Sequence, residues 1–327
     1  MRTDRGDSID SGTPSLPNPA PAAPAPLEVP HNAHSQVLDG LLERGGVVFL
    51  VGGIDTGKTT FGLELLRRSA SAGMPAAFVD ADIGQSTVGP PTTIGLKLCL
   101  DGGEVTRTSA RAADALAFVG SITPPGYLLP LVGGTAKMVG EARASGCRLI
   151  VVDSTGYVSG IGGQLLKFYK ADAVRPDVVV GFRRGGELEP VLGHARRFTP
   201  AEVMELDVPP EVMPRPADDR TTYRERQFAA YFAAGSSRWK IRPSVFMPAL
   251  PPEFDLALLD GLVVGLDDGG GTCRGIGVLE YGEPADILRM VSPVTSGVKG
   301  LRLGSIKIDI TGRLLGPVNL RQLFRTE

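Results

Sequence analysis

Cysteine, histidine and tryptophan are scarce in this sequence, and their scarcity disfavours several kinds of site. The 327 residues include three cysteines, three histidines and one tryptophan. No pair of cysteines or histidines has metal-ligand spacing, so we expect neither a disulfide framework nor a zinc site. Histidine-based catalysis is disfavoured as well, because the histidines adjoin a proline-rich tail or lie in a polar stretch.

Long apolar runs and a net excess of charge are also missing. No apolar run approaches the roughly 20 residues of a membrane-spanning helix. The N-terminus lacks the apolar region of a signal peptide, so we predict a cytoplasmic protein without a membrane span. The formal net charge is −2. Whole-molecule charge therefore gives no support for coating nucleic acid, and such binding has to come from a local basic patch.

The order of apolar runs predicts the fold. Residues 1–34 are rich in proline and alanine and predict a disordered tail, followed by a short helix from residue 35. The runs "GVVFLVG", "PAAFVDAD", "CRLIVVDST" and "PDVVVGF" are typical of buried strands, and helical patterns separate them. This alternation predicts an α/β domain over residues 35–240, with a parallel sheet covered by helices on both faces.

The pattern changes near residue 240. "LVVGLDDGGGTCRGIGVLEY" indicates two strands around a glycine-rich turn. "SIKIDIT" alternates strictly and places Ile306, Ile308 and Ile310 on one face of a strand. We therefore predict a small antiparallel β module over residues 241–327.

The stretch "GGIDTGKT" fits the phosphate-loop motif G-x-x-x-x-G-K-[ST], with a strand pattern before it and a helix pattern after it. Backbone N–H groups of such a loop converge on phosphates at a helix N-terminus. Lys58 would bridge the β- and γ-phosphates, and Thr59 would offer its hydroxyl to Mg²⁺. We therefore predict a P-loop NTPase sheet. Its nucleotide-binding residues would be Gly52, Gly53, Ile54, Asp55, Thr56, Gly57, Lys58, Thr59 and Thr60.

Three aspartates at strand ends are candidates for the chemistry. Asp80 and Asp82 lie on the same side of an extended chain, at the edge where open α/β sheets bind ligands. One carboxylate can hold magnesium or its water shell while the other accepts a proton from an attacking hydroxyl. Either can instead cap a helix or form a turn. Asp153 is a second candidate for the metal carboxylate, or an anchor for the loop after it, and the sequence leaves this choice open.

Arginines cluster in "PRPADDRTTYRERQFAAYF", before an aromatic helix end. On pattern alone they form a solvated helix face, because acidic residues sit among them at ion-pair spacing. Phosphoryl transfer gives them another use, since a well-placed arginine can raise its rate by about 10³–10⁵-fold. The arginines are Arg215, Arg220, Arg224 and Arg226.

These motifs, with "GSITPPG" and "DSTGYVSGIGGQLL", resemble the polynucleotide 5′-hydroxyl kinases in order and spacing, over roughly residues 45–235. That P-loop family includes the kinase subunit of the pre-mRNA cleavage and polyadenylation machinery, nucleolar ribosomal-RNA processing kinases, and archaeal and bacterial relatives. The aspartate inside the loop, Asp55, together with D-x-D-x-G-Q is more selective than the P-loop alone.

The resemblance implies transfer of the γ-phosphate of ATP to the 5′-hydroxyl of RNA or DNA ends. It makes Asp82 the general base and places Asp80 in the Mg²⁺ sphere with Thr59. It also makes an arginine pair five residues apart a lid over the triphosphate. The catalytic residues would be Lys58, Asp82, Arg215 and Arg220.

The resemblance also implies residues at the nucleic-acid substrate, namely Gln85, Thr123 and Tyr157. Thr123 is similar to a clasp Ser/Thr near the substrate phosphate. Tyr157 falls where relatives often have a tryptophan that stacks on the terminal base. Tyrosine can still stack, but this departure leaves base preference open. We also expect no counterpart of the eukaryotic members' N-terminal β domain, which helps hold adenine, and the adenine contacts are left open.

Two other classes of protein compete with the kinase. One is an ATP-locked scaffold for RNA-processing partners, which the intact Lys58, Asp82 and lid arginines disfavour. The other is a GTPase, which needs Asn/Thr-Lys-x-Asp to read guanine. The nearest sequence, "YKAD" at 169–172, lacks the first residue and lies in a helical stretch. The preference for RNA or DNA depends on contacts to the 2′-hydroxyl, which the sequence does not expose.

Overall fold

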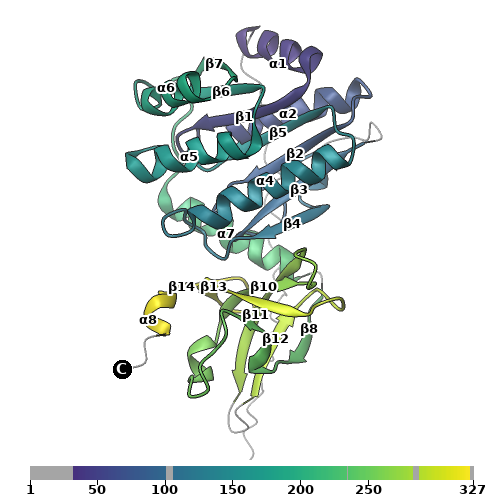
Figure 1. Ribbon diagram of the computed structural model, residues 1–327, viewed down its shortest axis with the longest axis vertical. Helices are drawn as coiled ribbons and strands as arrows, with labels where there is room; N and C mark the ends of the chain where they lie inside the picture. The colour runs from purple at the N-terminus through teal and green to yellow at the C-terminus, as the bar shows by residue number, and fades with distance from the viewer. Residues whose placement is uncertain (1–31, 101–105, 234, 283–286, 325–327) are drawn as a thin grey trace, which may run out of the picture. The chain divides into compact units, whose positions relative to one another are not determined.

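A computed structural model describes residues 32–100, 106–233, 235–282 and 287–324 (Figure 1). A disordered tail was predicted for residues 1–34, and residues 1–31 of it lie outside these described ranges. Residues 32–34 belong to the first helix, α1 (Asn32–Arg44), which therefore begins before the predicted residue 35.

Parallel strands form the nucleotide-binding part of the sheet, in the order β2-β5-β1-β6-β7. Every residue of β2 and β5 is buried, as expected for strands covered on both faces. The predicted α/β fold with a P-loop sheet is confirmed. The strands are β1 (Gly46–Gly52), β2 (Ala76–Ala81), β5 (Leu149–Ser154), β6 (Val178–Arg183) and β7 (Glu202–Asp207).

Helices cover this sheet on both faces. Figure 1 shows α4 and α5 lying across one face, and α6 belongs to the same layer. Residues of α1 and α2 pack on the other face. Along β5, Ile150 and Val152 pack on the α4–α6 side, while Leu149 and Val151 pack on the α1–α2 side. The helices are α2 (Lys58–Ser71), α4 (Leu128–Ala144), α5 (Gly160–Val174) and α6 (Glu189–Phe198).

This alternation continues to the end of β5 and decides which helix each polar residue meets. Successive side chains of a strand point to opposite faces. Asp153 therefore points toward the α2 side and Ser154 toward the α5 side, as their hydrogen bonds confirm. The same period places Asp80 of β2 on the α2 side.

One strand of the first half departs from the prediction. The sheet continues from β2 to β3 (Thr93–Cys99) and then to β4 (Ala115–Phe118), and both pairings are antiparallel. The prediction omitted β3, because glycine and lysine interrupt its apolar run "TIGLKLC". A short helix, α3 (Arg107–Ala110), lies between β3 and β4.

The C-terminal strands pair mostly antiparallel, and β10 and β11 form the predicted hairpin around the glycine-rich turn. Ile306 and Ile308 are buried as expected, whereas Ile310 lies beyond the strand and is exposed. The elements are β8 (Ser237–Lys240), η1 (Pro243–Val245), β9 (Phe246–Met247), η2 (Leu256–Leu259), β10 (Leu262–Asp267), β11 (Cys273–Gly282), β12 (Ile287–Ser292), β13 (Gly300–Ile308), β14 (Leu314–Pro317) and α8 (Leu320–Leu323).

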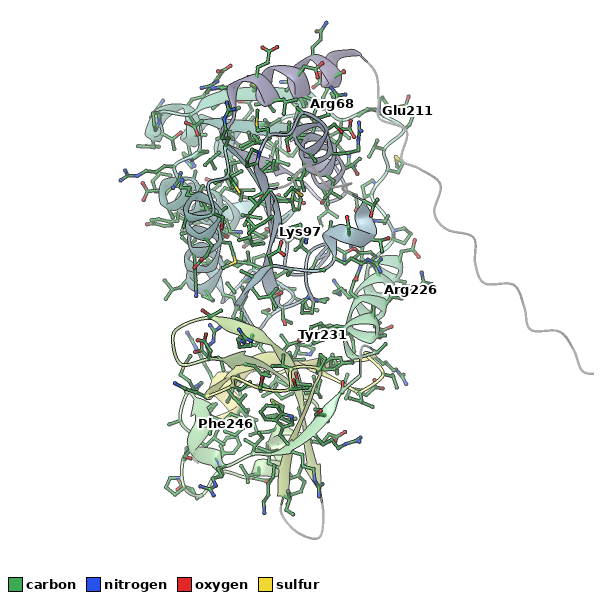
Figure 2. All side chains as sticks on the ribbon, turned by 90° about the vertical axis from the view of Figure 1, so that its right-hand side faces the viewer. Arg68, Lys97, Glu211, Arg226, Tyr231 and Phe246 are labelled. Carbon is green, nitrogen blue, oxygen red and sulfur yellow. The ribbon has the colours of Figure 1, made fainter. Side chains whose placement is uncertain are left out.

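The lid helix, α7 (Ala217–Phe232), carries Arg220 and begins two residues after Arg215, and it also contacts the C-terminal strands. Phe228 and Phe232 pack in one cluster with residues of β10 and β11. Figure 2 shows Tyr231 at the end of α7 that faces these strands. Strand β11 also pairs with β4 through Cys273 and Leu116, so the sheet is continuous. The division into domains at about residue 240 stays a proposal.

The three cysteines are free thiols. No helix in the described ranges is long and apolar enough to cross a bilayer.

Candidate active site

The loop between β1 and α2 has the backbone of a phosphate-binding loop. Gly57, at the N-cap of α2, has φ 89°, and Asp55 has φ 52°. Glycine adopts this left-handed conformation freely, and aspartate does so more often than most other residues. The buried Lys58 folds back over the loop, with Nζ donating to Gly53 O at 2.5 Å and lying 3.2 Å from Thr56 Oγ1. The predicted nucleotide-binding residues 52–60 thus form this loop and the first turn of α2.

Lys58 lies in the field of several carboxylates. Burial lowers the pKa of its ammonium below the usual value, while Asp153, Asp82 and Asp55 act in the opposite direction. The loop and the ends of β2 and β5 therefore enclose one site.

Asp153 meets the helix that follows the phosphate loop. Its Oδ2 accepts a hydrogen bond from Thr59 Oγ1 at 2.5 Å. Its Oδ1 is buried and has no hydrogen-bond partner among the described residues. Burial raises the pKa of Asp153 to about 6, against the lowering effect of Lys58 and Thr59. A buried oxygen without a partner beside a threonine hydroxyl fits a site for a divalent cation.

The hydrogen bonds of Asp80 differ from those of Asp153, because backbone N–H groups surround the Asp80 carboxylate. Its Oδ1 accepts from Asp82 N at 3.0 Å, and its Oδ2 accepts from Thr87 N at 2.5 Å and Val88 N at 2.9 Å. Burial raises the pKa of Asp80 to about 8, and Asp153 acts in the same direction. These contacts make Asp80 the anchor of the loop after β2. Its predicted role in the metal sphere stays a prediction, and the geometry favours Asp153 for that role.

Asp82 is the less buried acid of the D-x-D pair. Its Oδ1 accepts from Gly84 N and Gln85 N, both at 3.1 Å. No hydrogen bond from the described residues reaches its Oδ2. The tight turn thus fixes the carboxylate by one oxygen and leaves the other available as an acceptor.

The lid arginines meet the aspartate of the phosphate loop. Arg215 donates to Asp55 Oδ1 from Nε at 2.9 Å and from Nη2 at 2.6 Å, and its backbone N–H donates to Oδ2 at 2.9 Å. Arg220 Nη1 lies 4.0 Å from Asp55 Oδ2 and also donates to Arg215 O. The ring of Tyr223 lies 5.7 Å from the Arg215 guanidinium. Both predicted lid arginines therefore lie at the loop.

Two hydrogen bonds join the lid helix to the loop that follows Asp82. Gln85 Nε2 donates to Arg220 O at 3.1 Å, and Tyr223 Oη donates to Ser86 O at 3.1 Å. Gln85 Oε1 is buried without a partner among the described residues. Gln85 was predicted at the nucleic-acid substrate, and here it links the D-x-D loop to α7.

The other arginines of α7 differ in burial. Arg224 is half-buried, and its Nη2 donates to Thr221 Oγ1 at 3.0 Å. Burial lowers its pKa, Arg220 acts in the same direction, and Asp82 opposes them. Arg226 is exposed. Arg224 therefore faces the acids of the site, and Arg226 faces solvent.

The predicted substrate residues Thr123 and Tyr157 lie on loops at this edge of the sheet. Thr123 is exposed, and its N–H donates to Ser121 Oγ at 3.1 Å. The preceding residue is next to the D-x-D loop, since a Cβ on Gly84 would lie 2.7 Å from Ile122 O. Tyr157 is half-buried, with its hydroxyl against the start of α5 at Gly162. The structure leaves both roles as predictions.

Arg184 is a site residue that the sequence analysis missed. It donates to the backbone carbonyls of Ile54 and Asp55 at 2.8 and 2.7 Å, and to Val212 O at 2.9 Å. One guanidinium thus clamps the phosphate loop to the segment before the lid. Its sequence context, "FRRGGE", contains no signal of this role, because the contacts come from distant parts of the chain.

Lys167 and Lys170 were also missed. Both are on α5 and fully buried, at 1% and 0% exposure. In the sequence they resemble solvent-facing lysines of a helix. Both lysines lie near Asp82 and Asp153 because α5 packs on the sheet, and the sequence alone does not predict this placement.

No group of three or more His, Cys, Asp or Glu residues in the described ranges could hold a metal by itself. Magnesium bound to a nucleotide needs only one or two protein oxygens, because phosphates and waters supply the rest. The Thr59 and Asp153 oxygens meet that requirement.

A phosphate loop at the end of β1, acids at the ends of β2 and β5, and two arginines at the loop define a P-loop nucleotide-binding protein. The family model described as "mRNA cleavage and polyadenylation factor CLP1 P-loop" matches residues 52–234, more than half of the chain. The chain belongs to this family, and the resemblance found in the sequence is confirmed.

Curated relatives match most of the chain. The polyribonucleotide 5′-hydroxyl-kinase of Thermococcus kodakarensis is 29% identical over 82% of this chain and 90% of its own. The Pyrococcus furiosus protein of the same name is 27% identical over 84% and 91%. Among solved structures, the Clp1p–Pcf11p complex aligns with a TM-score of 0.62 at 12% identity, over 84% of this chain and 77% of that one. This last similarity shows the fold alone.

Proposed function

We propose that the protein is an ATP-dependent polynucleotide 5′-hydroxyl kinase, and that RNA ends are its main substrate. The names of the archaeal relatives support the reaction and the choice of RNA. DNA ends stay an alternative substrate. The cytoplasmic location expected from the sequence stays a prediction.

The observation that carries this proposal is the linkage of three parts around the phosphate loop. Gln85 and Tyr223 join the D-x-D loop to the lid helix, and Asp55 joins the lid to the phosphate loop through Arg215. A nucleotide-binding scaffold needs the phosphate loop but not a base-bearing loop coupled to a lid. Phosphoryl transfer needs all three parts, because base, phosphates and arginines have to meet at one reacting group.

In the proposed reaction the 5′-hydroxyl oxygen attacks the γ-phosphorus of ATP. The new oxygen–phosphorus bond forms as the bond to the β–γ bridging oxygen breaks, and ADP leaves with that oxygen. The hydroxyl proton passes to Oδ2 of Asp82, the oxygen that its own turn does not use. Lys58 and the lid arginines Arg215 and Arg220 offset the negative charge of the moving group.

We further propose that Mg²⁺ accompanies ATP and is held by Thr59 Oγ1 and Asp153. The buried Oδ1 of Asp153 supports this assignment. When bound, the ion would neutralise phosphate charge. Asp80 then serves the reaction indirectly, by fixing the loop that starts with Asp82.

Thr123 and Tyr157 are proposed to contact the nucleic-acid end. Thr123 is exposed beside the D-x-D loop, and Tyr157 is half-buried against the core, so we propose that the accessible part of its side chain stacks on a terminal base. Arg226, exposed on α7, is available to a backbone phosphate.

The test is transfer of labelled γ-phosphate from ATP to 5′-hydroxyl RNA and DNA oligonucleotides of one sequence. Asp82→Asn and Lys58→Ala serve as loss variants, and the exposed Lys240→Met in β8 serves as the control. We expect label on RNA with wild type and the control, and a loss of at least about 10²-fold with both loss variants. Tight ATP binding by wild type with no label on either oligonucleotide would contradict the kinase and favour the scaffold.

A further inference from the structure

Helix α5 buries two lysines beneath the acid-bearing edge of the sheet. Lys167 and Lys170 are among the largest fully buried side chains of the described residues. Lysine is almost never fully buried unless it is paired, because removing an ammonium from water is costly. Each lysine therefore needs a compensating partner, and the two find different ones.

Lys167 is compensated by hydrogen bonds. Its Nζ donates to Ser154 Oγ at 2.9 Å and to Thr155 O at 2.5 Å, and lies 3.4 Å from Thr155 Oγ1. Ser154 Oγ in turn donates to Leu50 O at 2.7 Å. Each N–H of this ammonium has an acceptor, so Lys167 ties α5 to the ends of β5 and β1.

Lys170 has no such set of acceptors. Within the described residues its only hydrogen bond runs from Nζ to Ala81 O, at 3.5 Å. Ala81 lies between Asp80 and Asp82, and the carboxylates of Asp82, Asp153 and Asp80 are the charges that act on Lys170. Burial lowers the pKa of Lys170 to about 8, against the raising effect of these carboxylates. These carboxylates favour the charged form of Lys170, and burial outweighs them.

The acids receive cations from both sides of the sheet. Lys58 approaches from the α2 side, and Lys167 and Lys170 approach from the α5 side. Asp82 and Asp153 act on each of the three buried lysines, and Asp80 acts on Lys170 as well. Lys170 is therefore one of the buried cations that offset the charge of Asp82 and Asp153.

We propose that Lys170 is the internal counter-ion of Asp82 and Asp153 and positions the end of β2 through Ala81 O for phosphoryl transfer. This role rests on the proposed kinase function. Because Lys170 is fully buried, we assign it no contact with nucleotide or acceptor; it acts by holding the acids at the separation and charge balance that transfer requires.

The proposal makes a prediction that a purely structural lysine would not. Removing a buried positive charge beside carboxylates makes the electrostatic potential at the carboxylate oxygens more negative. A divalent cation should therefore bind to them more tightly. A lysine that only supports packing would, when lost, displace the carboxylates and weaken cation binding. The sign of the change in metal affinity separates the two roles.

The experiment compares wild type with Lys170→Met, which keeps the length of the stem, and Lys170→Gln, which keeps a donor for Ala81 O without a charge. Lys170→Arg tests rescue by another cation, and Lys240→Met is the exposed control. Binding of Mn²⁺ alone is measured through the paramagnetic resonance signal of the free ion. Transfer kinetics with ATP and Mg²⁺ are measured in parallel, and urea denaturation identifies variants that fold.

We expect the two neutral variants to bind Mn²⁺ at least about ten-fold more tightly than wild type. Their kcat should fall by about 10²-fold, with KM for ATP within about three-fold. The arginine variant should retain the wild-type Mn²⁺ affinity and recover much of kcat. If Lys170→Met does not fold, Lys170→Gln carries the test.

Mn²⁺ affinity that is unchanged or weaker in the folded neutral variants would overturn the counter-ion role. Absence of transfer in wild type would instead contradict the kinase function. The Mn²⁺ measurement remains decisive for Lys170 in that case, because it uses neither ATP nor a nucleic acid.

Discussion

The hydroxyl of Thr59 donates to Asp153 Oδ2 at 2.5 Å and joins the first turn of α2 to the end of β5. The other oxygen of Asp153 is buried without a partner among the described residues. Asp80, next to Asp153 in the register of β2 and β5, has both oxygens on backbone N–H groups. The two neighbouring acids therefore have separable tasks.

Exchanging each acid for its amide should separate these tasks. Asp153→Asn should lower Mg²⁺-dependent transfer by about 10²–10³-fold with little effect on stability, because burial already disfavours the charged form of Asp153 and raises its pKa to about 6. Asp80→Asn should lower the free energy of unfolding by about 1–3 kcal/mol. Both oxygens of Asp80 accept hydrogen bonds from backbone N–H groups, and the NH₂ group of asparagine cannot accept them. Urea denaturation and Mg²⁺ titration of transfer measure both effects. Equal kinetic losses with unchanged stability in both variants would mean that both acids serve the metal.

Arg215→Ala should lower transfer with little effect on stability. The Arg215–Asp55 pair is partly exposed, with 46% of the arginine side chain accessible, and such pairs contribute only about 0–1 kcal/mol. Loss of a lid arginine should lower kcat by about 10²-fold or more. Arg215→Lys should recover little, because lysine cannot reproduce the paired contacts of Nε and Nη2 with Asp55 Oδ1. Steady-state kinetics and the melting temperature are measured for wild type and both Arg215 variants. A large drop in melting temperature would mean that this contact is mainly structural.

Gly156→Ala should weaken ATP binding through the backbone of the phosphate loop. A Cβ at Gly156 would lie 2.7 Å from Ile54 N and 2.8 Å from Ile54 Cα, so the loop would have to move. We expect Kd for ATP to rise by at least about ten-fold, because the loop's amides bind phosphates only when they converge. Gly193→Ala, on α6 with open space at its Cβ, is the matched control and should leave Kd unchanged. Unchanged ATP binding in Gly156→Ala would show that the loop adapts to the extra methyl.

The sequence predicted those parts of the site whose functional residues lie next to one another in the chain. The phosphate loop from Gly52 to Thr59 is a single stretch between a strand and a helix, so its motif predicts both the local fold and the ligand. The D-x-D pair could be identified as functional, but the separate roles of Asp80 and Asp82 depend on which amides the folded loop presents.

What the sequence could not predict arises from contacts between distant segments. Arg184 and Lys170 look like ordinary surface cations, and only their placement against the phosphate loop and Ala81 shows otherwise. The choice between Asp80 and Asp153 was open for the same reason, since both end buried strands. In the fold, β3 escaped prediction because its side chains do not form a continuous apolar run.

A further prediction concerns pH and the attachment of the lid helix. Tyr231 of α7 accepts a hydrogen bond from Ile276 N at 3.0 Å. Burial raises the pKa of the Tyr231 phenol to about 12. The folded state therefore keeps this proton at pH values where the unfolded chain, with a tyrosine pKa of about 10, has lost it. The resulting stability is fully present below pH 10 and is lost as the pH rises toward 12.

Wild type should lose about 1.4 kcal/mol of stability through this group between pH 9 and pH 11, and Tyr231→Phe should not. Near neutral pH the phenylalanine variant should be less stable by about 1–3 kcal/mol, since it leaves the Ile276 N–H unsatisfied. The stability difference between the two proteins should therefore shrink with rising pH. Urea denaturation at several pH values measures it, with Tyr169→Phe as the exposed control on α5. A difference that stays constant up to pH 11 would mean that water reaches the phenol and that burial does not raise its pKa.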